Sequence, residues 1–380
     1  MNKENYKILK DLISFNTIED KENNNIINYI KEYLETLNFK VQLLNLANKK
    51  ALVATCGVPN LCFIGHTDTV KCSSNWNTNP FELKITDDKM CGLGVCDMKG
   101  GIAAFLDTLK NINLDELKKG IQIIITFDEE IGSEGINLIK KSNILIPDNV
   151  LIGEPTNLIP VVACKGCMEY KVKFLGKSAH SSRLIYGDNA IISCLKFTKE
   201  LIKFADSLKA IKSDLFEDIP YTTMNIGLIN GGTAINMVPD ECYLSFDFRT
   251  ISKSEQYRIQ KTLEKVFLKY NLEYELFTNI YPCKVENEEA LKNIEAITNK
   301  KSISYSYVTE GNIINKNNIV ILGPGPVSAH EDNEFIEISS YEDTKKIIEF
   351  YCKGELQIYE SRTKNSSRIY GIKSRRSNSI

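Results

Sequence analysis

The chain has 380 residues, of which 43% are hydrophobic and 25% charged, values typical of a globular protein with two domains. A net charge of −2 provides no basic surface for nucleic acid or an anionic membrane, so we expect neither partner. The charged opening MNKENYKILKDL has no signal-peptide core, and no apolar run approaches the roughly 18–20 residues of a membrane span. We expect a cytoplasmic protein whose 11 cysteines are mostly reduced thiols.

The first part of the chain, to about residue 160, predicts an α/β layer structure. Apolar residues at helical spacing cover 5–18 and 24–39. Short apolar runs then alternate with helical ones, which is typical of strands and helices packed in layers.

Residues able to bind a metal ion follow four predicted strands, at the carboxyl end of each. In open α/β sheets ligands bind beyond the carboxyl ends of the strands, so these side chains are expected to converge at one edge. The strands and the residues after them are 61–65 with His66 and Asp68, 121–127 with Asp128, Glu129 and Glu130, 149–153 with Glu154, and 319–325 with His330.

Residues 168–283 predict a second unit in which strands and helices follow a different order. The order strand, helix, strand, strand, helix, strand is that of the ferredoxin-like fold. The expected strands are 169–180, 222–231, 241–250 and 273–282, and the expected helices are 189–208 and 254–270.

The simplest organisation is an α/β domain that this second unit interrupts. The main domain would consist of 1–167 and 284–358, and the inserted domain of 168–283. Residues 359–380 are rich in lysine and arginine, and we expect a mobile, solvated tail there.

The candidate ligands are imidazoles and carboxylates without thiolates, a set that suits zinc or a similar divalent ion. They exceed one tetrahedral site, so we expect two ions about 3.5–4 Å apart that share a carboxylate and a water. Asp68 lies on the same side of an extended chain as His66 and is placed to orient its ring. Neighbouring Glu129 and Glu130 point differently, so one can bind metal while the other acts as general base. The candidate metal-binding and base residues are His66, Asp97, Glu129, Glu130, Glu154 and His330.

Several of these features also have non-catalytic interpretations. Asp97 precedes a helical run and would serve equally well as an N-cap. The stretch DEE at 128–130 also suits an exposed acidic loop. Cys164 and Cys167, in CKGC, lack the second pair that a structural zinc site needs, and we interpret them as ordinary thiols.

The chain resembles the di-zinc deacylase and carboxypeptidase family that includes acetylornithine deacetylase, succinyl-diaminopimelate desuccinylase and aminoacylase-type enzymes. The resemblance runs from about residue 5 to 352 and implies a catalytic domain with a mixed sheet flanked by helices. A ferredoxin-like βαββαβ lid and dimerisation domain would interrupt it, and the protein would form a homodimer. The motifs are GHTDTV, GLGVCDMKGG, DEE, GEPT, AHSS, INGGTAINMVPDECYLSFDFR and GPGPVSAHEDNE.

The resemblance implies a role for each candidate residue. Asp97 would bridge two divalent ions, Zn²⁺ with Co²⁺ as a substitute, and Asp68 would orient His66. Glu129 would be the general base, and His180 would enter the partner's active site to stabilise the oxyanion. The other implied roles are His66 and Glu154 as ligands of one ion, Glu130 and His330 as ligands of the other, and Asn236 and Arg249 as substrate contacts.

Within this family, GLGVCDMKGG, the ACKG after GEPT, and the stretch ending in FDFR resemble acetylornithine deacetylase most closely. The expected substrate is a small N-acyl amino acid, N2-acetyl-L-ornithine, which would give L-ornithine and acetate in arginine biosynthesis. Gly311 and Asn312 depart from that subfamily, which commonly has alanine and a small residue or proline there. We expect their loop to lie near the substrate pocket.

Other functions remain open on the sequence. A succinyl-diaminopimelate desuccinylase, a related deacylase or a dipeptidase would keep the chemistry and change the substrate. A non-catalytic dimeric binding protein and a serine hydrolase that uses His180 and Ser181 are rivals from other classes.

Overall fold

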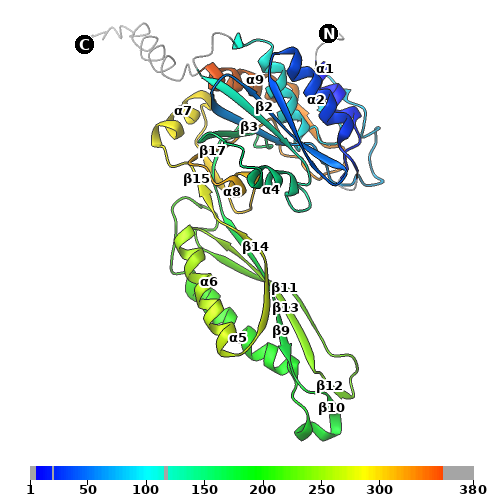
Figure 1. Ribbon diagram of the computed structural model, residues 1–380, viewed down its shortest axis with the longest axis vertical. Coiled ribbons are helices and arrows are strands. Elements are labelled where there is room, and N and C mark those ends of the chain that lie inside the picture. The colour runs from blue at the N-terminus through cyan, green and yellow to red at the C-terminus, as the bar shows by residue number, and fades with distance from the viewer. Residues whose placement is uncertain (1–5, 19–20, 115–118, 354–380) are drawn as a thin grey trace, which may run out of the picture.

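The structure is a computed structural model that describes residues 6–18, 21–114 and 119–353. It is elongated, with a large α/β unit at one end and a smaller sheet-and-helix unit at the other (Figure 1). The basic tail expected at 359–380 lies outside the described residues. The fold class predicted from the sequence is confirmed, whereas the domain boundaries stay a prediction.

The large unit contains a mixed sheet of nine strands among the described residues, in the order β1-β2-β6-β3-β7-β17-β8-β15, with β16 paired to β8. The four strands predicted to end in metal-binding residues are the consecutive neighbours β6, β3, β7 and β17, and they run parallel. Their carboxyl ends therefore meet at one edge. The strands are β1 (Lys40–Leu46), β2 (Lys49–Cys56), β3 (Pro59–His66), β6 (Gly120–Thr126), β7 (Asn149–Ile152), β8 (Val161–Cys164), β15 (Cys283–Lys284), β16 (Ile303–Tyr305) and β17 (Asn318–Ile321).

Helices cover both faces of this sheet, which explains its nearly continuous apolar strands. Phe63 faces the layer that contains α1, α2, α3 and α9, and its ring stacks on Phe105 at 4.0 Å between centroids. The next residue, Ile64, faces the opposite layer, which contains α4 and α8. The helices of this unit are α1 (Lys7–Ser14), α2 (Asn24–Thr36), α3 (Lys99–Leu109), α4 (Glu134–Lys141), α7 (Glu288–Thr298), α8 (Glu310–Ile314) and α9 (Ile338–Lys353).

A small second sheet joins two segments that are far apart in the sequence. Its strands β18 (Phe335–Glu337), β5 (Lys89–Cys91) and β4 (Lys84–Ile85) pair in that order. The pairing of β18 with β5 is antiparallel. It brings the loop after β17 beside the loop that leads into α3.

The start of α3 approaches the main chain of its neighbours very closely. A Cβ atom on Gly100 would lie 2.0 Å from the carbonyl oxygen of Val95, and one on Gly101 would lie 1.9 Å from that of Gly153. A side chain at Gly101 would force the helix away from the edge of the sheet, and one at Gly100 would displace the loop that leads into the helix. The glycine pair of DMKGG is therefore a packing requirement.

The smaller unit, here called the lid, is a four-stranded antiparallel sheet with the order β11-β13-β9-β14 and two helices. When β9, β11, β13 and β14 are numbered 1 to 4 in chain order, their order across the sheet is 4-1-3-2, which is the predicted ferredoxin-like arrangement. Its elements are β9 (Gly166–Leu175), α5 (Ala190–Leu208), β11 (Thr223–Gly231), β13 (Glu241–Thr250), α6 (Lys253–Lys269) and β14 (Glu273–Ile280). A short ribbon of β10 (Ala179–His180) and β12 (Met237–Val238), with a 3₁₀ turn at Ser181–Tyr186, forms the far end of the lid (Figure 1).

Asn312 ties together the two connections between the lid and the large unit. Its side-chain amide donates hydrogen bonds to the carbonyl oxygens of Lys165 (3.1 Å) and Tyr281 (3.0 Å). Its Oδ1 accepts the N–H of Thr309 at the start of α8. Asn312 is only 3% exposed. This residue, at which the chain differs from the acetylornithine deacetylases that it resembles, therefore stabilises the junction between the two units.

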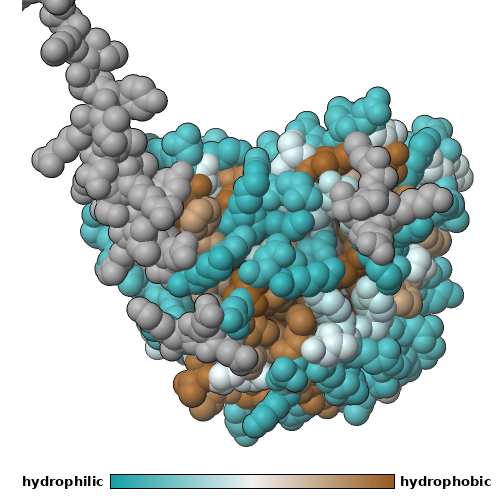
Figure 2. Space-filling model, turned by 90° about the horizontal axis from the view of Figure 1, so that it is seen from above, coloured by the Kyte–Doolittle hydropathy of each residue, from teal (hydrophilic) through white to brown (hydrophobic). Residues whose placement is uncertain are grey.

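The described helices and the surface at the end away from the lid can be compared with what a membrane protein would show. None of the described helices is both long and apolar enough to cross a bilayer. Seen from the end away from the lid, hydrophilic residues cover most of the surface, and hydrophobic residues show between them (Figure 2).

The close approach of α3 predicts that Gly101→Ala destabilises the protein by about 1–3 kcal/mol, since the added methyl group overpacks a rigid contact. Gly227→Ala is the matched control, because a Cβ there meets no atom closer than 3.8 Å. Denaturant unfolding monitored by circular dichroism measures both variants. Equal stability of the two variants would contradict the packing argument.

Candidate metal centre

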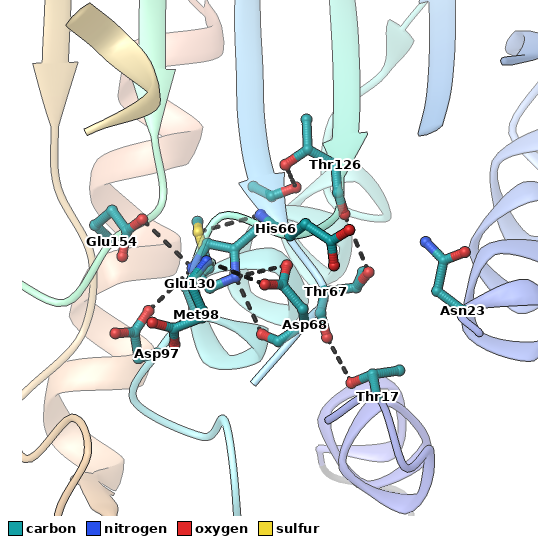
Figure 3. A network of polar contacts seen from close by, with 12 residues as sticks. Thr17, Asn23, His66, Thr67, Asp68, Asp97, Met98, Thr126, Glu130 and Glu154 are labelled. Carbon is teal, nitrogen blue, oxygen red and sulfur yellow. Dashed lines mark hydrogen bonds and ion pairs between the residues drawn. The ribbon is translucent and has the colours of Figure 1, made fainter. Parts of the chain in front are cut away.

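The imidazole of His66 lies at the carboxyl end of β3 and is almost fully buried. Its Nδ1 lies 3.1 Å from the carbonyl oxygen of Asp68 and 3.4 Å from the Oδ1 atom of that residue. Its Nε2 points the other way, 3.1 Å from Asp97 Oδ1 and 3.5 Å from Glu154 Oε1 (Figure 3). Because Asp68 occupies Nδ1, Nε2 is the atom that faces the carboxylates.

Asp97 turns its two carboxylate oxygens toward two different histidines. Oδ1 faces His66 Nε2 at 3.1 Å, and Oδ2 faces His330 Nε2 at 3.6 Å. The N-cap interpretation of Asp97 is wrong, since Met98 occupies that position and α3 has no side-chain cap. The side chain of Asp97 is therefore directed into the cluster, between imidazoles from opposite halves of the chain.

Glu130 and His330 form the other side of the cluster. His330 Nε2 lies 3.2 Å and 3.1 Å from the two carboxylate oxygens of Glu130. The main-chain N–H of Glu130 donates to Asp68 Oδ2 at 3.2 Å, which links the loop after β6 to the loop after β3. Ligand atoms of His66, Asp97 and Glu130 all lie within 4.8 Å of one another, a spacing that suits a shared metal ion.

The cluster concentrates negative charge at a partly buried site, where His66 is buried, the carboxylates are half-buried and His330 is exposed. Burial and the neighbouring charge of Asp97 raise the pKa of Glu154 well above its usual value. Burial also raises the pKa of Glu129 to about 8, with Glu310 and Asp97 adding to the shift against the opposing effect of His66. Burial alone would lower the pKa of His66, but the nearby carboxylates of Asp68 and Glu154 outweigh it and hold that pKa well above normal.

The donor set of this cluster fits divalent metal ions. Among the described residues, no lysine or arginine forms an ion pair with Asp97, Glu129, Glu130 or Glu154, so only imidazoles balance these carboxylates. Buried charges of one sign are stable when they coordinate a cation, which lowers the pKa of each carboxyl group. The nitrogen and oxygen donors, with no thiolate, match zinc and related ions.

The predicted lid residues lie outside this cluster within one chain. His180, on β10, is exposed and pairs with Met237 of β12 at the far end of the lid (Figure 1). Asn236 lies beside it, and its carbonyl oxygen accepts the N–H of Ser181 at 3.0 Å. Arg249 lies near the other end of the lid sheet, where its Nε donates to Asp247 Oδ1 at 3.0 Å.

The serine-hydrolase alternative finds no nucleophile at His180. The ring Nδ1 lies 2.8 Å from Ser182 Oγ and accepts the main-chain N–H of the same serine at 3.2 Å. This is a local turn around the imidazole, and Ser181, the serine of that hypothesis, takes no part through its side chain. No described carboxylate contacts the ring to orient it as a base.

Two buried glutamates beside the cluster escaped sequence analysis. Glu310 begins α8 and is fully buried, and burial raises its pKa to about 7. Glu334 follows His330 by four residues, and burial likewise raises its pKa to about 7 against the opposing hydrogen bonds from Gly94 and Asp97. Of the two, only Glu334 carried a signal, which is its place in the motif GPGPVSAHEDNE. Its role was not predicted, because its partners are main-chain groups that no side-chain pattern indicates.

Comparison with known proteins agrees with this geometry. The model of peptidase family M20/M25/M40 matches residues 62–353. The chain belongs to this family. As an M20 chain it is a hydrolase of a metal-dependent family, which confirms the enzyme class and the family resemblance predicted from the sequence.

Similar proteins include acetylornithine deacetylases and several solved M20 peptidases. The acetylornithine deacetylase of Buchnera aphidicola subsp. Schizaphis graminum is 34% identical over 364 residues, which cover 90% of this chain and 95% of the relative. That of Photorhabdus laumondii is 32% identical, with 87% and 90% covered. A Staphylococcus aureus tripeptidase has a TM-score of 0.71 at 25% identity, with 91% of this chain and 97% of that one covered. A Bacillus subtilis M20 peptidase described as dinuclear metal binding has a TM-score of 0.65 at 13% identity, with 93% and 97% covered, and supports the fold.

Proposed function

We propose that this M20 hydrolase removes the acetyl group from N2-acetyl-L-ornithine at a centre of two divalent metal ions. The observation that carries the proposal is the pair of oxygens of Asp97, each turned to a different histidine. Glu129 lies close enough for its pKa to respond to the charges of His66 and Asp97. The curated relatives named acetylornithine deacetylase, which match over most of the chain, support this substrate.

The proposed ligands divide into two groups around Asp97. His66 and Glu154 would hold one ion, Glu130 and His330 the other, and Asp97 would bridge them. The mixture of imidazole and carboxylate donors favours Zn²⁺, with Co²⁺ as a substitute. When bound, these ions would supply Lewis acidity to the amide carbonyl and to the attacking water.

Glu129 is the proposed general base, and it moves one proton in two steps. It takes the proton from the attacking water and then passes it to the leaving nitrogen of the amide. Its neighbour Glu130 faces His330 and is the proposed ligand of the pair. Asp68 holds Nδ1 of His66 and thereby keeps Nε2 directed at the carboxylates.

A second copy of the chain is the proposed source of His180. The far end of the lid exposes large apolar side chains near it, including Ile185 at 87% and Ile235 at 102% exposure, and Leu228 on β11 of the lid sheet is 70% exposed. Exposed apolar clusters of this kind typically mark protein interfaces. We propose that a partner lid covers them, and that His180 and Asn236 reach the partner's centre to stabilise the oxyanion and contact the substrate. Arg249 is the proposed grip on the substrate carboxylate, for which a guanidinium is suited.

The cytoplasm and arginine biosynthesis are the proposed setting of the reaction. Cysteines such as Cys62, Cys96 and Cys164 are buried thiols, as expected in a reducing compartment. Cys164 and Cys167 lie on different strands, β8 and β9, and are buried. A peptidase is the second candidate function, because several solved structures that share the fold are peptidases, among them the tripeptidase of Staphylococcus aureus.

We expect the purified protein to hydrolyse N2-acetyl-L-ornithine faster than N-succinyl-diaminopimelate or dipeptides. Chelation followed by dialysis should abolish the activity, and Zn²⁺ or Co²⁺ should restore it, because the metal supplies the polarisation that the side chains lack. Release of free amine measures each reaction. Faster cleavage of dipeptides would favour the peptidase, and activity that survives chelation would contradict the metal centre.

Glu129→Gln should lower turnover by about 10²–10⁴-fold, because the side-chain amide of glutamine is not basic enough to take a proton from water. Its metal content, measured by mass spectrometry, should equal that of the wild type, since Glu129 is not a proposed ligand. Glu134→Gln is the matched control, an exposed glutamate five residues along the chain that should retain full activity. Near-normal turnover of Glu129→Gln would refute the assignment of the base.

A hybrid dimer tests the exchange of His180 between subunits. Glu129→Gln and His180→Ala homodimers should both be nearly inactive. When the two variants are co-expressed with different tags, the doubly purified hybrid has one complete site and should show about half the wild-type rate per dimer. A hybrid as inactive as its parents would mean that His180 acts on its own subunit. An active His180→Ala homodimer would mean that His180 takes no part in the reaction.

A further inference from the structure

Glu334 is buried beneath the loop that carries Asp97 and is only 3% exposed. Its Oε1 accepts the main-chain N–H groups of Cys96 at 2.6 Å and Asp97 at 2.9 Å. Its Oε2 accepts the N–H of Gly94 at 2.9 Å. A single carboxylate therefore holds three amides of the loop 92–98, and such charge-assisted hydrogen bonds are about twice as strong as neutral ones.

Further contacts join the loop of Glu334 to the loop of Asp97. The N–H of Gly92 donates to the carbonyl oxygen of Glu334 at 3.2 Å. The N–H of Ser328 lies 3.4 Å from Cys96 Sγ, and the Cys91 thiol donates to the carbonyl oxygen of Asn333. The segment that supplies His330 and the segment that supplies Asp97 are thus fastened together on both sides of the histidine.

We infer that Glu334 is a positioning residue that fixes the peptide of Asp97 relative to His330. It acts through the main chain of the Asp97 loop, because its two oxygens are directed to the three amides and not into the cluster. Its effect would be to hold Oδ2 of Asp97 toward His330 while Oδ1 faces His66. The inference rests on the proposed function in one respect, namely that Asp97 and His330 are ligands of the same pair of ions.

The chemistry of the contact requires a carboxylate. Glutamine has nearly the same shape, but one of its two terminal groups is an NH₂ donor. That group would face either the N–H of Gly94 or the N–H groups of Cys96 and Asp97, donor against donor. Glu334→Gln therefore breaks at least one of the three hydrogen bonds while it preserves the packing.

The experiment compares Zn²⁺ binding by the apoproteins of the wild type, Glu334→Gln and Glu331→Gln, in competition with a chromophoric chelator. Glu331 is the matched control, an exposed glutamate on the same loop. We expect Glu334→Gln to bind Zn²⁺ about 10–100-fold more weakly, the usual effect of removing a group that orients a ligand. At saturating Zn²⁺, its kcat for N2-acetyl-L-ornithine should fall while KM stays near the wild-type value.

Zinc affinity separates a positioning role from a purely structural one, which would lower only the melting temperature of the apoprotein. If Glu334→Gln binds Zn²⁺ as tightly as Glu331→Gln, the inference is wrong. If Glu334→Gln does not fold, Glu334→Asp, which keeps the charge but shortens the side chain, takes the same test with the same criterion. A wild-type protein that takes up no Zn²⁺ would instead refute the proposed metal centre, so the two failures are distinguishable.

Discussion

The placement of Asp97 between His66 and His330 is the constraint on which the rest of the large unit depends. The two imidazoles come from segments more than 250 residues apart in the sequence, and each faces one oxygen of the same carboxylate. Glu129, Glu130 and Glu154 crowd the same space and would repel one another without a counter-ion. The surrounding structure therefore has to hold these carboxylates together against their mutual repulsion when no metal ion is bound.

The fold meets this constraint through rigid elements on three sides. Parallel neighbours β6, β3 and β7 end together and deliver Glu130, His66 and Glu154 from one edge. The glycine pair at the start of α3 brings the loop of Asp97 against that edge. The pairing of β18 with β5 then fastens the loop of His330 to the loop of Asp97. Each proposed ligand is carried by a different element, and the contacts between elements set the geometry.

The sequence predicted which strands end at the metal-binding edge of the sheet, but it did not predict the contacts among the residues at that edge. Apolar runs followed by histidine or acidic residues identified β3, β6, β7 and β17, because burial on both sheet faces leaves an unmistakable hydrophobic pattern. The ferredoxin-like order of the lid was likewise readable from alternating strands and helices. The residue pattern could not decide whether Asp97 is an N-cap or a metal ligand, since both roles are compatible with an acidic residue just before a helix. Glu334 was equally hidden, because its partners are main-chain amides brought near by tertiary packing, and the distance of His180 from the cluster depends on the length of the lid.

The position of β17 has a consequence for folding during synthesis on the ribosome. This strand lies between β7 and β8 in the sheet, yet β7 ends at Ile152 and β17 begins at Asn318, after the whole lid. At typical rates of synthesis the nascent chain carries an unpaired edge on β7 for roughly 10–30 s before its neighbour emerges. Open edges of this kind invite pairing with other chains. The lid, whose strands follow one another in the sequence, can fold during that interval, whereas the cluster around Asp97 is completed only when the segment with His330 has been synthesised.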